Sequence, residues 1–207
     1  MTGALVNPAV TRDAVGTHAP EAPLAFHRAL EGYAPTPVRR LDDVAAQLGL
    51  AAVAVKDESG RLGLPAFKIL GAAWAVDRAL AAAAQPVHTL VAASAGNHGR
   101  AVAHAAARRG LRARVFLPAR SVPARRAAIA GERAEVVVVD GDYEAAVAAA
   151  AAAGRAPGVL EIADVGSSDT ARWVVDGYAT LFAELDPEAH DLLTLKGLKL
   201  LHERNSG

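Results

Sequence analysis

The chain contains no cysteine among its 207 residues. This absence excludes disulfide bonds, thiolate metal sites and a cysteine nucleophile. Aromatic residues make up only 4% of the sequence, and 22 basic and 22 acidic residues cancel to a net charge of zero. A neutral composition gives no electrostatic reason to expect a nucleic acid or an anionic membrane surface as a partner.

The sequence also lacks an apolar run long enough to cross a bilayer, because charged residues and glycines interrupt stretches such as 145–153. Such alanine-rich stretches favour helices instead. Residues 1–20 show no basic region followed by an apolar core, so we expect no signal peptide. Together these features predict a cytoplasmic protein without a membrane segment.

Apolar strands and amphipathic helices alternate regularly from residue 86 onward. Strands separated by helices with short connections are typical of an α/β fold with a parallel sheet and right-handed crossovers. The expected strands are 89–93, 112–117, 135–139 and 159–162, and the expected helices are 97–109, 123–130 and 143–153.

The flanking segments are less regular. Residues 1–35 contain four prolines and little apolar periodicity, so we expect this segment to wrap an edge. The expected elements before the alternating unit are a helix at 41–48, a strand at 51–55 and a helix at 67–84, and one helix at 170–185 follows it. The leucine- and lysine-rich tail after residue 187 is interpreted as a terminal amphipathic helix.

One lysine, Lys68, stands among apolar neighbours at the start of the expected 67–84 helix. Because burying a charged lysine is costly, we expect desolvation to lower its pKa from about 10.4 and to favour the neutral, nucleophilic amine. A lysine that forms a Schiff base with an aldehyde cofactor needs this property. The alternative is a surface lysine whose aliphatic stem packs on the core.

A second informative run joins the expected strand 89–93 to the helix that follows, and it reads Ala93-Ser94-Ala95-Gly96-Asn97-His98-Gly99. Backbone N–H groups at such a helix start bind anions such as a carboxylate. Gly96 permits close approach of a ligand to the backbone, and Ser94 and Asn97 add side-chain donors. The alternative is an ordinary helix N-cap with turn chemistry.

Taken together, four runs resemble the fold-type II pyridoxal-phosphate enzymes, which include threonine dehydratase, serine racemase and cysteine synthase. They are Pro35-Thr36-Pro37, Lys56-Asp57-Glu58-Ser59, Ala66-Phe67-Lys68-Ile69-Leu70-Gly71 and Ser94-Ala95-Gly96-Asn97-His98-Gly99. The resemblance covers roughly residues 22–185. Within that group the chain looks most like the diaminopropionate ammonia-lyases, on the runs Phe26-His27, Gly32-Tyr33 and Trp173-Val174-Val175-Asp176-Gly177-Tyr178.

The resemblance implies pyridoxal 5'-phosphate as the cofactor, no metal, and a small amino acid as the substrate. It implies that Lys68 is the Schiff-base lysine and also shuttles the α-proton. Phe67 would pack against the cofactor ring, and Asn97 would hydrogen-bond to the phenolic oxygen of the ring.

The resemblance also implies the substrate-binding residues. Ser94 and the backbone N–H groups of Ala95, Gly96, Asn97 and His98 would hold the substrate carboxylate. The family carries one aspartate directly before the Gly-Asn-His run, where it can serve as a second acid–base group, and a further aspartate near the helix that follows the small domain.

Asp164 is the best match for that further aspartate and Asp169 the next, although a plain turn aspartate at the end of a strand remains an alternative for Asp164.

The activity implied is an α,β-elimination on a substrate like 2,3-diaminopropionate, which gives a 2-oxo acid and ammonia. Ala95 stands where diaminopropionate ammonia-lyases carry an aspartate and matches the form in threonine and serine dehydratases. A dehydratase-like enzyme therefore remains an alternative.

The resemblance further implies a domain division. Residues 1–85 would form the N-terminal part of a large domain, residues 86–168 a small α/β domain, and residues 169–207 a return helix followed by a divergent tail. The glycine-rich phosphate loop of the family has no counterpart, because the later glycines stand singly. We therefore expect a C-terminally truncated chain whose complete form is a homodimer, with a non-enzymatic remnant or interaction domain as the rival hypothesis.

Overall fold

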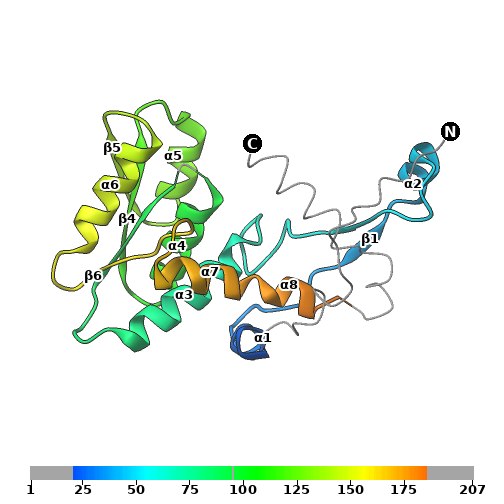
Figure 1. The fold of residues 1–207 in the computed structure, drawn as a ribbon, viewed down its shortest axis with the longest axis horizontal. Helices are drawn as coiled ribbons and strands as arrows, with labels where there is room; N and C mark the ends of the chain where they lie inside the picture. The colour runs from blue at the N-terminus through cyan, green and yellow to red at the C-terminus, as the bar shows by residue number, and fades with distance from the viewer. Residues whose placement is uncertain (1–20, 95, 186–207) are drawn as a thin grey trace.

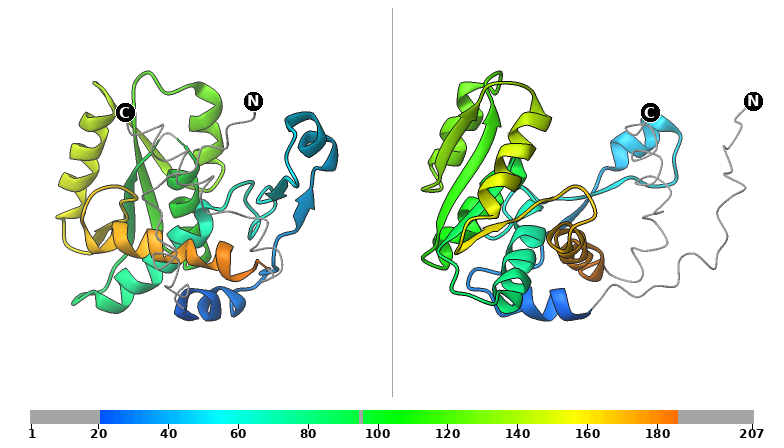
Figure 2. Two further views of the ribbon diagram at one scale, coloured as in Figure 1. Left: turned by 45° about the vertical axis from the view of Figure 1, so that its right-hand side comes forward. Right: turned by 60° about the vertical axis from the view of Figure 1, so that its left-hand side comes forward.

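The computed structural model describes residues 21–94 and 96–185 (Figures 1 and 2). Its centre is a four-stranded parallel sheet in the order β5-β4-β3-β6. The strands are β3 (Thr89–Ala93), β4 (Arg112–Pro118), β5 (Glu135–Val139) and β6 (Val159–Glu161). This sheet confirms the predicted α/β class, and its strands lie within one residue of the expected positions.

Helices cover both faces of the sheet. The helix α4 (Asn97–Arg108) contacts β3, β4 and α5 (Pro123–Ala130), whereas α6 (Tyr143–Gly154) packs on the opposite face (Figure 1). Because successive side chains of a strand point to opposite faces, β3 contributes Leu90 and Ala92 to one core and Val91 and Ala93 to the other. The sheet is therefore buried on both sides.

Two further helices complete this side of the protein. The helix α3 (Lys68–Ala82) packs against α4, and α7 (Asp169–Gly177) packs against α3. They meet at two glycines, since a Cβ atom on Gly177 would lie only 2.8 Å from Gly71 Cα. A residue with a side chain at either position would force the two backbones apart. The helix expected over 170–185 is divided, because a short helix α8 (Ala179–Ala183) follows α7 after Tyr178.

The segment expected to wrap an edge contains a helix that was not predicted, because Glu21–Arg28 form α1, which contacts α3 and α8. Pro23 lies in its first turn, where a missing backbone N–H costs no hydrogen bond. The prolines of this segment are therefore compatible with a helix that the sequence did not predict.

Residues 38–56 form an arm that projects from the body of the protein (Figure 1). The strands β1 (Val38–Arg40) and β2 (Ala54–Lys56) pair antiparallel, and the helix α2 (Asp42–Leu48) connects them. α2 confirms the expected helix at 41–48, whereas the strand expected at 51–55 begins only at Ala54.

No helix in the described ranges is both long and apolar enough to cross a membrane. The same ranges contain no group of three or more histidine, aspartate or glutamate side chains arranged to hold a metal ion. The helix predicted for the tail after residue 187 lies outside the described residues.

Candidate active site

The predicted site residues gather at one edge of the sheet. Ser94 follows β3, and Asp164 follows β6, three residues after its last residue. Because β3 and β6 are adjacent and parallel, their carboxyl ends meet at the same edge. Ligands of open α/β sheets bind at such edges.

Lys68 and Asp164 form the central pair of this site. Lys68 Nζ donates a hydrogen bond to Asp164 Oδ2 at 3.1 Å across 96 residues of sequence. The Lys68 side chain is 29% exposed and that of Asp164 14% exposed, so the pair is partly shielded from water and still reachable. Asp164 also lines a surface hollow together with residues of α7 (Ala171, Arg172, Trp173, Val175 and Asp176).

The expected direction of the Lys68 pKa is wrong for the free protein. Burial does lower the pKa of Lys68, but the neighbouring Tyr178 and Asp164 raise it, and the net pKa lies above the ordinary lysine value. Desolvation alone would lower the pKa of Lys68, whereas an opposite charge at hydrogen-bond distance favours the charged form and raises it. Lys68 is therefore an ammonium group at neutral pH in this structure.

His98 connects the start of α4 to the segment that carries Asp164. Its Nε2 donates to the Ile162 carbonyl at 2.8 Å, and its Nδ1 lies 3.8 Å from Asp164 Oδ2. Burial lowers the pKa of His98, which outweighs the opposite influence of Asp164. His98 is therefore a neutral imidazole, and its hydrogen bond to Ile162 holds the start of α4 against the segment that carries Asp164. The sequence did not predict this hydrogen bond.

The start of α4 has no side-chain cap. Just before the helix, Gly96 N–H donates a hydrogen bond to Ser94 Oγ at 3.2 Å. Asn97, the first residue of that helix, is exposed. Gly99 is required for the tight packing, since a Cβ atom there would lie 2.7 Å from the Ser94 carbonyl oxygen. Ala95 lies outside the described residues.

Two aromatic rings enclose Lys68. Its Nζ lies 5.8 Å from the centre of the Phe67 ring and 5.2 Å from that of Tyr178, and the two rings meet edge to face at 5.1 Å. Such contacts stabilise a cation. Sequence reasoning assigned no role to Tyr178, although the Gly177-Tyr178 pair belongs to a run that carried the family resemblance.

A buried ionic cluster, formed by Tyr33, Lys56, Glu58, Arg61 and Glu184, fixes the loop that leads to Lys68. Arg61 is 1% exposed and donates to Glu58 and Glu184, each at 2.6 Å. Glu184 also accepts from Tyr33 at 2.7 Å and lies 2.8 Å from Lys56 Nζ. We call this the Arg61 cluster. It joins the segment around Tyr33, the loop after β2 and the end of α8.

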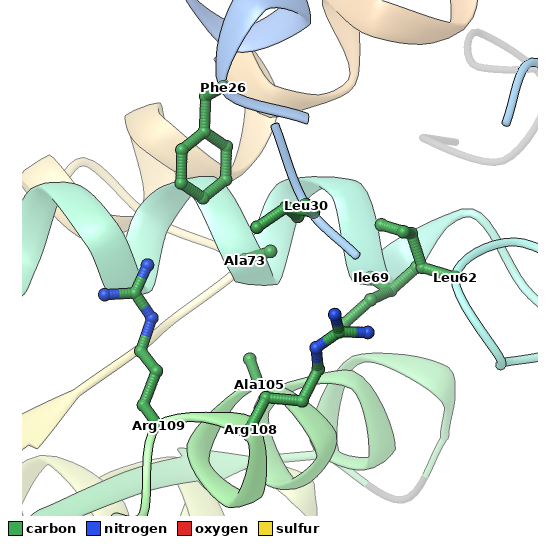
Figure 3. Close-up of a pocket in the computed structure, with 8 residues that line it drawn as sticks. All are labelled: Phe26, Leu30, Leu62, Ile69, Ala73, Ala105, Arg108 and Arg109. Atoms are coloured by element: carbon green, nitrogen blue, oxygen red, sulfur yellow. The ribbon is translucent and has the colours of Figure 1, made fainter. Parts of the chain in front are cut away.

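A separate pocket lies between α1, α3 and α4 (Figure 3), and it is lined by Phe26, Leu30, Leu62, Ile69, Ala73, Ala105, Arg108 and Arg109. Its two arginines already have partners. Arg109 bonds Asp77 at 2.9 Å, and Arg108 donates to the Glu31 carbonyl at 2.7 Å. The Lys68 edge is therefore the better candidate for chemistry.

Comparison with known proteins gives a consistent result. A family model described as pyridoxal-phosphate dependent enzyme matches residues 29–195. The diaminopropionate ammonia-lyase of Salmonella typhimurium is 36% identical over 184 residues, which cover 78% of this chain and 46% of that protein. The Escherichia coli K12 protein of the same name is 35% identical over 178 residues, covering 77% of this chain and 45% of that protein.

The fold is similar as well. The crystal structure of Escherichia coli diaminopropionate ammonia lyase in apo form gives a TM-score of 0.76 at 33% identity, with 83% of this chain and 51% of that chain covered. The chain thus spans about half the length of the relatives that it matches.

Proposed function

The chain belongs to the pyridoxal-phosphate-dependent enzyme family, and we propose that it catalyses α,β-elimination on a small amino acid like 2,3-diaminopropionate, giving a 2-oxo acid and ammonia. The observation that carries this proposal is the hydrogen bond between Lys68 Nζ and Asp164 Oδ2 at 3.1 Å. It pairs an amine with a carboxylate at the edge of a parallel sheet, beside a helix start without a side-chain cap. Similarity to two curated diaminopropionate ammonia-lyases supports the substrate class.

The groups around Lys68 fit the aldehyde end of pyridoxal phosphate. Two buried polar atoms beside the Lys68–Asp164 pair, Tyr178 Oη and His98 Nδ1, have no hydrogen-bond partner within residues 21–94 and 96–185. Unpaired buried polar atoms are rare in proteins and often mark a functional site. Lys68 would bind the aldehyde through its amine, Phe67 would pack against the ring, and Asn97 would hydrogen-bond to the ring oxygen.

When bound, pyridoxal phosphate supplies an electron sink that stabilises the negative charge left on the substrate α-carbon. The protein must then hold the substrate and move protons. We assign the carboxylate of the substrate to Ser94 and to the backbone N–H groups of residues 95–98, because a helix start favours an anion. Lys68 gives up the extra proton of its free ammonium form when it binds the aldehyde, and as a neutral amine it would take the α-proton on Nζ. Asp164 would stabilise the resulting ammonium and act as the second acid–base group.

Four finer points stay predictions. Ala95 leaves a dehydratase-like preference for serine or threonine as the alternative substrate class. The division into residues 1–85, 86–168 and 169–207 is proposed from the family resemblance, and the sheet with α4, α5 and α6 would form the central unit. A homodimer and a cytoplasmic location are likewise predictions.

The test is a titration of the purified protein with pyridoxal phosphate to saturation. We expect a visible absorbance band that depends on Lys68 and is missing in Lys68→Ala. Each 2,3-diaminopropionate consumed should then release one 2-oxo acid and two molecules of ammonia, one from the β-carbon on elimination and one from the α-carbon on hydrolysis. Serine and threonine, as competing substrates, should release one ammonia for each 2-oxo acid. A band of equal size in Lys68→Ala, or no band in the wild type, contradicts the proposal.

A further inference from the structure

The O–H of Tyr178 is a buried donor without an acceptor. Its oxygen is closed to solvent and the O–H donates to no acceptor within the described residues, while the polar group beside it, the Lys68 ammonium, can only donate. The other two tyrosines of the sequence differ, because Tyr33 donates to Glu184 at 2.7 Å and Tyr143 donates to the Ala93 carbonyl at 3.4 Å. A buried hydroxyl that gains no hydrogen bond lowers the free energy of unfolding, and such groups are often retained because they serve a function.

The packing of α3 and α7 fixes the Tyr178 ring beside Lys68. A Cβ atom on Gly71 would lie 2.5 Å from Tyr178 Cε1 and 2.8 Å from Tyr178 Cζ, so the missing side chain makes room for the ring. Gly71 follows Lys68 by three residues, which places both on the same side of α3. The Phe67 ring also meets the Tyr178 ring edge to face, with the two ring centres 5.1 Å apart.

The hydroxyl is a hydrogen-bond donor at neutral pH. Burial raises the pKa of Tyr178, Lys68 lowers it and Asp164 raises it again, and the net pKa lies above the ordinary tyrosine value. A neutral phenol and a neighbouring ammonium group can both donate hydrogen bonds to an oxygen acceptor, such as a carboxylate, carbonyl or phenolic oxygen.

We propose that Tyr178 is a ligand-binding residue of the Lys68 site, whose hydroxyl donates a hydrogen bond to an oxygen atom of the bound cofactor or substrate. This inference rests on the proposed function. Its basis is the unpaired hydroxyl, the space provided by Gly71 and the distance of 5.2 Å from Lys68 Nζ to the centre of the Tyr178 ring.

The experiment compares Tyr178→Phe with the matched control Tyr33→Phe in the full chain. Urea unfolding of the free protein should show Tyr178→Phe to be at least as stable as the wild type, because the variant removes an unpaired buried hydroxyl. Tyr33→Phe should be less stable, because it deprives Glu184 of a donor.

The binding measurement then identifies the ligand. In Tyr178→Phe we expect about a tenfold higher Kd for pyridoxal phosphate, the factor that corresponds to one hydrogen bond of roughly 1.4 kcal/mol. If the Kd for the cofactor stays constant and only the Kd for 2,3-diaminopropionate rises, the acceptor belongs to the substrate. Either result supports the inference, provided that Tyr33→Phe leaves both constants within twofold of the wild type.

Two results would overturn the inference while leaving the proposed function intact. One is unchanged binding of both ligands in Tyr178→Phe, and the other is a clear loss of stability in the free variant, which would reveal a structural partner for the hydroxyl. A wild-type protein without a Lys68-dependent absorbance band would instead overturn the proposed function, and the inference with it.

Discussion

At the scale of single residues, the groups that face a buried side chain decide its charge. Lys68 faces a carboxylate at 3.1 Å, so its ammonium form is favoured although the residue is half-buried. His27 is fully buried and faces a hydroxyl and a carbonyl instead. Its Nδ1 lies 2.8 Å from Thr180 Oγ1, and its Nε2 donates to the Leu70 carbonyl at 2.9 Å. Burial lowers the pKa of His27 to about 4, so this imidazole is neutral.

This neutral histidine predicts a pH-dependent loss of stability. The folded pKa of about 4 lies below the unfolded value of 6.5, so the unfolded chain binds the proton first as the pH falls. The stabilisation is complete above pH 6.5 and decreases down to pH 4, by about 3 kcal/mol. We expect the stability advantage of the wild type over His27→Gln in urea unfolding to shrink by that amount between these pH values.

The exposed His88 offers the matched control for this measurement. His88→Gln should follow the wild-type pH dependence across the same range. Parallel curves for the wild type and His27→Gln would show that the buried imidazole does not control stability in this window.

At the scale of elements, the Arg61 cluster joins the end of β2, the loop before α3 and the residue that follows α8. Its members come from three places in the chain, and Glu184 follows α8 while Lys56 is the last residue of β2. The two basic and two acidic side chains balance, so the cluster buries no net charge. Removing one partner would leave an uncompensated buried charge, which is far more costly than losing a surface ion pair.

Glu184→Gln should therefore lower the free energy of unfolding by about 3–5 kcal/mol at neutral pH. Burial raises the pKa of Glu184, but bonds from Arg61, Lys56 and Tyr33 lower it to about 2. A carboxylate with a depressed folded pKa stabilises the protein above its unfolded pKa near 4.5, and that stabilisation is lost as the pH falls toward 2. Unfolding measured from pH 5 to pH 2 should show this loss in the wild type and a flatter profile in the variant.

The surface pair of Arg114 and Glu135, 3.0 Å apart, provides the control. Glu135→Gln should have little effect on the free energy of unfolding at neutral pH or on its change between pH 5 and pH 2. A Glu184→Gln protein as stable as this control would mean that the Arg61 cluster does not hold the loop.

The sequence predicts features that depend on neighbouring residues and misses those that depend on contacts between distant segments. Apolar periodicity and glycine stops located the sheet and α3, because those signals act between neighbouring residues. The family resemblance located Lys68 and Asp164, and the structure places them in contact. The link from Arg61 to Glu184 joins residues 123 positions apart, so no local pattern reports it. The Lys68 pKa was missed for the same reason, since its direction depends on groups brought together only by folding.

At the scale of the whole molecule, the protein combines a densely packed body with a projecting arm. All five residues of β3 are buried, and α3 packs on both α4 and α7. In the arm, Ala45 is the only buried residue of α2, and Leu48 is 63% exposed. The site at Lys68 stands on the body, and the arm joins it through β2 and the Arg61 cluster.

Regions with few buried contacts open more readily than the core, so this division predicts a gradient of hydrogen exchange. Amides of α2 should exchange at or near the rate of local fraying, whereas those of β3 should exchange only through global unfolding, which makes them slower by orders of magnitude. Peptides that span Lys56 and Arg61 should fall between the two, because the Arg61 cluster anchors that end of the arm. In Glu184→Gln these intermediate peptides should approach the rate of α2 while β3 stays the most protected segment. Equal protection of α2 and β3 in the wild type would mean that the arm and the body unfold as one unit.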